Sequence, residues 1–180
     1  LVLTVTECTA AAAVRNEDNT FTYISAGGKV LENNAADGGL PTVLGVTLNA
    51  QIGDFLDTGT DAHVDAMLNV LENMDAAGLL EKMSFLNLND LTDVRIGCGG
   101  RFDLRIGAVD SDLSYRIRFA QTVMSERLSP SDIGRLYWDD EGRMHFVPET
   151  AEEKRRYAAA QERRRRRLEE RTEEEAAQGA

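Results

Sequence analysis

The sequence predicts an α+β domain in which a mixed, largely antiparallel sheet carries two amphipathic helices packed on one side, followed by a charged C-terminal helix. Three observations lead to this prediction. Short segments rich in β-branched and aromatic residues outnumber the helical segments. Two longer segments place apolar residues along one stripe at helical spacing. The residues after position 149 intersperse basic and acidic side chains at high density.

Short strands dominate the first third of the chain. The turn formed by Ala26, Gly27 and Gly28 predicts a β-hairpin, because glycine adopts positive φ without steric cost. Residues 33–39 are polar and are expected to form a loop. Strands or extended segments are expected at residues 1–7, 10–14, 20–25, 29–31, 40–45 and 46–48.

The first helix is predicted over residues 60–77. Thr60 or Asp61 can cap its start, and Gly78 stands where a helix commonly ends. Its apolar stripe consists of Val64, Met67, Leu68, Leu71 and Met74.

Two strands are expected next, at residues 79–88 and 94–96, followed by a turn at residues 97–100. Residues 101–106 alternate cleanly and predict a half-exposed antiparallel strand. Its core face carries Phe102, Leu104 and Ile106, and its exposed face carries Arg101, Asp103 and Arg105.

A second helix, a hairpin and a third helix complete the predicted elements. The second helix spans residues 112–128, with Asp110 or Ser111 as its cap and Pro130 after its end. Strands at 133–138 and 143–147 then flank an acidic turn. Thr150 and Glu153 form a capping box before a helix at about 151–175, which opposite charges at i,i+4 hold in solvent unless it frays into a disordered tail. Its arginine run, residues 163–167, is expected to be a solvated helix face because glutamates flank it.

Charge and reactive residues exclude several classes of function. Twenty Lys and Arg stand against 31 Asp and Glu, a net charge of −11, whereas nucleic-acid binding needs a cationic face. His63 and His145 are far apart and lack neighbouring ligands, so neither a metal nor a cofactor is expected. Cys8 and Cys98 either pair or remain two buried thiols. Because no nucleophile stands with a base, we expect no enzymatic activity.

The closing hairpin is the candidate binding site. It places aromatic residues on the last strands before the tail, among them the only tryptophan. The last strand of a sheet in sequence is often an edge, whose free N–H and C=O groups accept a partner's strand. Some of these side chains are also expected to cover the core. The candidate residues are Tyr137, Trp138, Arg143, Met144, His145, Phe146 and Val147.

The order of several short motifs resembles the β domain of the FtsQ/DivIB family of bacterial division proteins. The matching segments cover residues 1–148 without a large gap. They are Val5-Thr-Glu7, Tyr23-Ile-Ser-Ala-Gly-Gly28-Lys-Val30, Leu40-Pro41-Thr-Val-Leu-Gly45, Gly100-Arg-Phe-Asp-Leu-Arg-Ile-Gly107, Asp112-Leu-Ser-Tyr-Arg-Ile117, Ser131-Asp-Ile133 and Phe146-Val-Pro148. Two positions depart from the family: Ala10 stands where the family has proline, and Gly134-Arg135-Leu136 replaces its Asp-Leu pair.

The resemblance implies a non-enzymatic scaffold at the division septum. A single-pass membrane helix and a POTRA domain would precede residue 1, with residues 1–7 as the junction. Residues 1–148 would be the extracytoplasmic β domain, and 149–180 a variable tail. Its partners would be FtsB/DivIC-like and FtsL-like proteins, through which it helps to control septal peptidoglycan synthesis. By position, Trp138 and Phe146 would correspond to two aromatic residues of the family's partner interface, and Met144 lies on the strand between them. The other candidates are included because they are adjacent to these positions: Tyr137, Arg143, His145 and Val147.

A second reading of the sequence is a ligand-binding module, secreted or anchored at a surface. Its site would be a groove between the helices and the sheet. A hydrolase is the least supported alternative.

Overall fold

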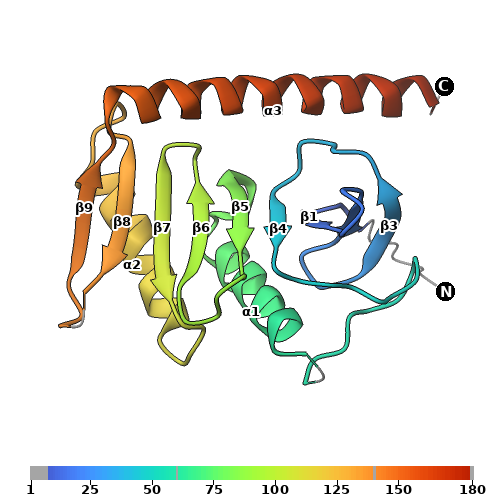
Figure 1. Ribbon diagram of the computed structural model, residues 1–180, viewed down its shortest axis with the longest axis horizontal. Helices are drawn as coiled ribbons and strands as arrows, with labels where there is room; N and C mark the ends of the chain where they lie inside the picture. The colour runs from blue at the N-terminus through green and yellow to red at the C-terminus, as the bar shows by residue number, and fades with distance from the viewer. Residues whose placement is uncertain (1–7, 60, 140, 179–180) are drawn as a thin grey trace, which may run out of the picture.

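A nine-stranded mixed sheet and three α-helices make up the described part of the chain, which confirms the α+β class (Figure 1). The structure, a computed structural model, describes residues 8–59, 61–139 and 141–178. The strands lie in the order β3-β2-β1-β4-β5-β6-β7-β8-β9. They are β1 (Ala12–Arg15), β2 (Phe21–Ile24), β3 (Val30–Ala35), β4 (Thr42–Leu44), β5 (Met83–Asn87), β6 (Val94–Cys98), β7 (Phe102–Gly107), β8 (Gly134–Trp138) and β9 (Met144–Pro148).

Two crossover connections set the position of the helices. Helix α1 (Ala62–Ala76) joins the parallel neighbours β4 and β5, and helix α2 (Leu113–Glu126) joins the parallel neighbours β7 and β8. Such crossovers are right-handed, and both start from strands that point the same way, so they carry their helices to the same face. Both helices lie behind the strands in Figure 1. The strand expected to be antiparallel at residues 101–106 is β7. It pairs antiparallel with β6 on one side and parallel with β8 on the other.

One main core lies between these helices and the sheet. From α1 it includes the buried Val64, Met67, Leu71 and Met74, and from α2 it includes Leu113, Ile117 and Ala120. The two helices also touch each other, since the Gln121 Nε2 donates to the Ala77 carbonyl at 2.7 Å. A smaller cluster around Phe21 and Tyr23 lies apart from this core.

Helix α1 begins and ends as expected, whereas α2 begins differently. The Asp61 carboxylate accepts the His63 N–H at 2.7 Å, and Gly78 has a φ of +65° just after the helix. The expectation that Asp110 or Ser111 caps α2 is wrong. Asp112 occupies the cap position without a side-chain hydrogen bond to the helix. The Asp110 carboxylate accepts the Asp112 N–H at 2.9 Å and so closes the turn that precedes the helix.

Three further expectations about strands are wrong. The polar segment at 33–39 is a strand as far as Ala35, which pairs with Phe21 across an irregular register. A 3-10 helix at Leu80–Lys82 replaces the start of the strand expected at 79–88. The predicted turn at 97–100 begins two residues later, because Gly97 pairs with both Phe85 and Asp103. Glycine fits this strand position because a Cβ there would collide with the Ser84 hydroxyl and the Phe85 ring.

The cysteines are both free, Cys8 at the surface and Cys98 buried, so the expectation of two buried thiols is wrong for Cys8. Burial raises the pKa of the Cys98 thiol to about 11. The strand expected at 1–7 and the Glu153 side chain of the capping box lie outside the described residues. Helix α3 (Ala151–Gln178) follows β9 directly.

Candidate partner-binding edge

Strand β9 forms one edge of the sheet, with β8 as its only strand neighbour in the described chain. The Glu149 N–H donates to Ile133 at 2.8 Å and the Asp139 N–H to Arg143 at 2.9 Å. In an antiparallel pair, hydrogen-bonded and non-hydrogen-bonded positions alternate. The backbone groups of Met144 and Phe146 therefore point away from β8, toward the free edge.

Pro148 limits this free edge. It occupies the next outward-pointing position along β9 and has no N–H to donate. A strand added beside β9 would thus find the N–H and C=O groups of Met144 and Phe146 and then one lone carbonyl. A short edge that ends in proline restricts indiscriminate strand pairing.

The seven candidate residues do not form one patch, because they lie on both faces of the hairpin. Met144 and Phe146 turn toward the helices and pack against the main core. The Phe146 ring meets Phe102 edge to face, with ring centres 6.3 Å apart. The opposite face carries Tyr137, His145 and Val147, and the exposed Arg143 side chain lies at the turn.

An aromatic patch lies one strand inward from the edge, where Trp138 of β8 pairs with Met144 of β9. It consists of Trp138 of β8 with Tyr115 and Phe119 of α2, and the Trp138 ring centre lies 6.0 and 5.2 Å from theirs. Tyr115 is 61% exposed and Phe119 is 38% exposed. The Trp138 Nε1 is buried without a hydrogen-bond partner. The patch offers apolar contact area beside the free backbone groups of β9.

Sequence reasoning missed Tyr115 and Phe119 as candidate binding residues. They are four positions apart on α2 and opposite the stripe that packs on the core, so they lie on one exposed helix face. That spacing was the available signal. What the sequence alone could not show is that this helix face lies next to Trp138.

A polar network holds the outer side of the hairpin turn. The Asp139 carboxylate accepts the Arg143 N–H at 2.9 Å, the Arg143 Nε at 3.0 Å, and the His145 Nε2 at 2.7 Å. The His145 ring stacks on Tyr137 at 5.2 Å between centres. The Arg143 backbone donor, followed by the His145 ring, holds the pKa of Asp139 well below its ordinary value.

We expect the network to stabilise the hairpin at neutral pH and to fail in acid. A carboxyl group whose pKa is lowered by folding stabilises the folded state above its ordinary pKa of 3.8. That stabilisation disappears as the pH falls through 3.8 toward the lowered value. Asp139→Asn should therefore destabilise the protein at pH 7, and the difference from wild type should be much smaller at about pH 2. Urea unfolding followed by Trp138 fluorescence measures both; an equal difference at the two pH values would contradict the assignment.

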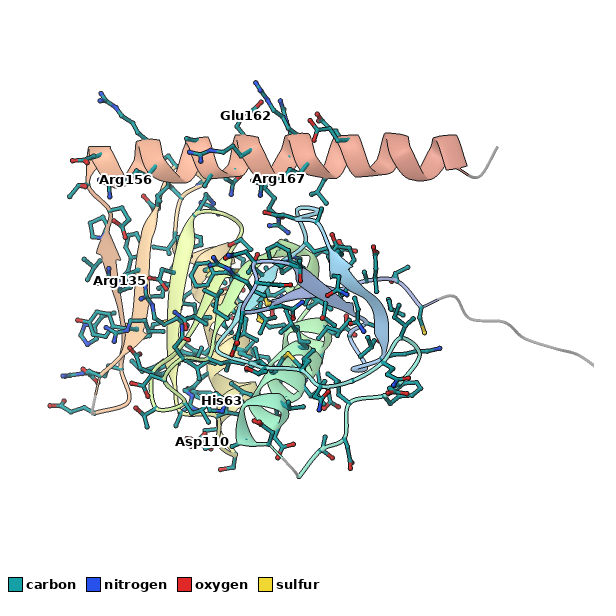
Figure 2. All side chains as sticks on the ribbon, turned by 45° about the vertical axis from the view of Figure 1, so that its right-hand side comes forward. His63, Asp110, Arg135, Arg156, Glu162 and Arg167 are labelled. Carbon is teal, nitrogen blue, oxygen red and sulfur yellow. The ribbon has the colours of Figure 1, made fainter. Side chains whose placement is uncertain are left out.

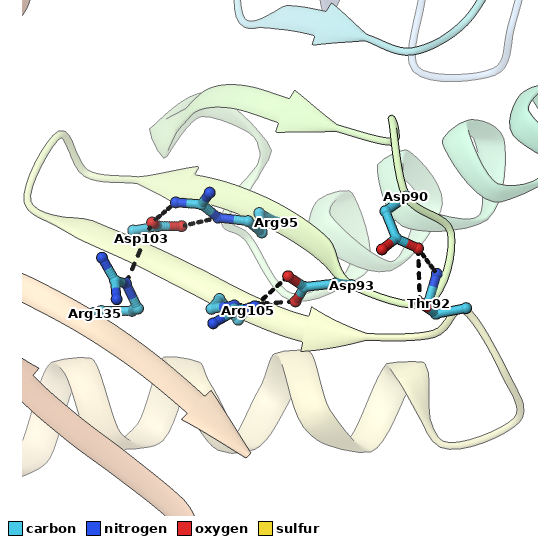
Figure 3. Close-up of polar contacts among 7 residues, drawn as sticks. All are labelled: Asp90, Thr92, Asp93, Arg95, Asp103, Arg105 and Arg135. Atoms are coloured by element: carbon cyan, nitrogen blue, oxygen red, sulfur yellow. Dashed lines mark hydrogen bonds and ion pairs between the residues drawn. The ribbon is translucent and has the colours of Figure 1, made fainter. Parts of the chain in front are cut away.

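Charged side chains form a second network on the outer face of β6–β8 (Figure 3). Arg95 binds the Asp103 carboxylate through two nitrogens, and the Arg135 Nε lies 3.8 Å from the same carboxylate. Arg105 binds Asp93 in the same two-nitrogen way. The expectation that Asp103 is exposed is wrong: its side chain is only 3% exposed, because the two arginines cover it.

A metal centre and a ligand-binding hollow are two other kinds of site that a fold of this size can hold. Among the described residues, no group of three or more His, Cys, Asp or Glu side chains could hold a metal ion. Open hollows of about 380, 440 and 460 Å³ all include Thr47 in their lining. They surround the segment 44–50, and the hollow of about 440 Å³ also reaches Asp61 and Val64 at the start of α1.

No family model matches the chain, and no curated protein matches it. Among the helices that the structure describes, none is both long enough and apolar enough to cross a bilayer.

Proposed function

We propose that this chain is a non-enzymatic binding domain that takes up a partner's strand at the free edge of β9. The observation that carries the proposal is the outward-pointing backbone of Met144 and Phe146, set beside the aromatic patch of Tyr115, Phe119 and Trp138. Backbone pairing supplies affinity in strand addition, and side-chain contacts supply specificity. Helix α2 contributes Tyr115 and Phe119 to this patch, and both contact Trp138 of β8.

The motif order described above extends the proposal to a division-site scaffold of the FtsQ/DivIB type. The partners would then be FtsB/DivIC-like and FtsL-like proteins, and the domain would lie outside the cell membrane at the septum, anchored by a helix that precedes residue 1. The geometry bears on the edge and its aromatic patch; the family and its partners rest on the sequence resemblance.

Met144→Pro tests the edge directly. Proline at this position removes the outward N–H and sets a ring where the added strand would lie. We expect binding of the extracellular segment of an FtsB/DivIC-like partner to weaken roughly tenfold or more, about 1.4 kcal/mol. Isothermal titration calorimetry measures the dissociation constant.

Met144→Ala is the matched control. It removes the same side chain but keeps the N–H, so the difference between the two variants isolates the backbone donor. The circular dichroism of both variants must stay like that of wild type for the comparison to hold. Equal binding by Met144→Pro and Met144→Ala would contradict strand addition at β9.

A further inference from the structure

Helix α3 runs across one end of the sheet rather than away from it (Figure 1). It starts three residues after β9 and returns over the strand ends to the side of β3. In doing so it reaches both the turn between β6 and β7 and the loop between β3 and β4. These two connections belong to opposite halves of the sheet, β5–β9 and β1–β4.

Specific side chains of α3 hold these two connections. The Gln161 Nε2 donates to the Gly99 carbonyl at 3.3 Å in the β6–β7 turn. The Arg164 Nε donates to the Gly39 carbonyl at 2.8 Å in the β3–β4 loop, and Arg167 forms an ion pair with Asp37. Leu168 packs over the same loop, since a Cβ on Gly39 would lie 3.0 Å from the Leu168 Cγ.

Helical periodicity explains the arginine run. Positions 161, 164, 167 and 168 share the helix face that meets the sheet, because residues three and four apart are neighbours on a helix. Arg165 and Arg166 instead pair with Glu162 on the other side, and Figure 2 shows Glu162 away from the sheet and Arg167 toward it. The expectation of a wholly solvated run is therefore wrong for Arg164, whose half-buried guanidinium has its pKa lowered by burial.

The join that α3 spans is short. The two halves of the sheet meet where β4 lies parallel to β5, over three residue pairs from Thr42↔Phe85 to Leu44↔Asn87. Parallel pairing is slightly less stable per residue than antiparallel pairing. Contacts that tie the far loops together across this join therefore restrict the motion of one half relative to the other.

We propose that α3 is a strap that fastens the β3–β4 loop to the β6–β7 turn and that salt releases it. Its ion pair between Arg167 and Asp37 lies at the surface, where mobile ions screen it. Among the described side chains of α3, Leu168 provides an apolar contact with the same loop. A docked strap also directs the chain leaving β9 back over the sheet, which leaves the free edge of β9 uncovered. The effect of the strap on partner binding rests on the function proposed above. The contacts of the strap with the two loops do not, because they form within a single chain.

The five arginines provide both the test and its control. The test variant is the full chain with Arg164→Ala and Arg167→Ala, which removes the contacts with Gly39 and Asp37. The control variant carries Arg163→Ala and Arg166→Ala, which removes the same amount of positive charge and leaves those contacts intact. Amide hydrogen exchange is read at Gly39, whose N–H is held by Asp37, and at Gly99, whose N–H is held by Lys82. We expect roughly tenfold faster exchange at Gly39 in the first variant only. In wild type, 1 M NaCl should accelerate exchange at Gly39 in the same direction.

Circular dichroism separates release of the strap from melting of the helix. Alanine has the highest helix propensity, so neither double variant should lose helix. Equal exchange rates at Gly39 in the two variants would overturn the proposal, and so would an unchanged rate in the first. Failure of partner binding at β9 would leave this result untouched, because the measurement uses the chain without a partner.

Discussion

Arg95→Ala should lower the free energy of unfolding by about 3 kcal/mol, within the range for breaking a buried ion pair. The Asp103 side chain is 3% exposed, and Arg95 is the residue that hydrogen-bonds it. Removing Arg95 uncovers one side of the carboxylate and leaves Arg135, whose Nε is 3.8 Å away, on the other. The charge then loses its hydrogen-bonded partner and regains only part of its hydration, which makes the substitution costly.

Arg105→Ala is the matched control, and we expect it to cost only about 0–1 kcal/mol. Arg105 stands directly opposite Arg95 on the neighbouring strand and is exposed to a similar degree, 41% against 37%. It binds Asp93 through the same pair of nitrogens, but the Asp93 side chain is 34% exposed and returns to water when its partner is removed. Urea unfolding of the two variants compares them. Equal losses would show that burial of the carboxylate does not decide the cost.

Local patterns predicted the elements whose signals lie within the chain segment itself. Helix α1 has a continuous apolar stripe, a capping aspartate and a terminal glycine, and all three occur where the sequence places them. The closing hairpin was predicted in the same way, from two apolar segments around an acidic turn. The start of strand β3 was predicted, but its second half, residues 33–35, was missed because its polar residues resemble a loop; it pairs with β2.

Features that depend on distant neighbours were beyond local reasoning. Alternation placed Asp103 on the solvent side of β7 correctly, but two arginines from β6 and β8 bury it there. The edge position of β9 could be predicted because β9 is the last strand in the sequence. Its aromatic patch could not, because Trp138 and Phe119 are brought together by the crossover through α2. The docking of α3 likewise depends on loops far from it in sequence.

Gly134→Ala should destabilise the protein by about 1–3 kcal/mol, the usual cost of overfilling a packed position. A Cβ at this position would collide with the Val147 carbonyl oxygen of β9 and would lie 2.7 Å from the Phe146 ring. The backbone carbonyl cannot move without breaking the β8–β9 ladder, so the strain falls on the edge strand. We therefore expect the loss to be concentrated in the hairpin that carries the proposed binding edge.

Gly27→Ala provides the comparison for this loss, because a Cβ at Gly27 meets no atom within 4 Å. Its effect should stay within about 0.5 kcal/mol, as for most surface substitutions. The fluorescence of Trp138, the only tryptophan, reports directly on the affected hairpin. A stable Gly134→Ala variant with an unchanged Trp138 spectrum would mean that the position of β9 does not require glycine at residue 134. A destabilised variant that also loses partner binding would link the seating of β9 on β8 to the use of its free edge.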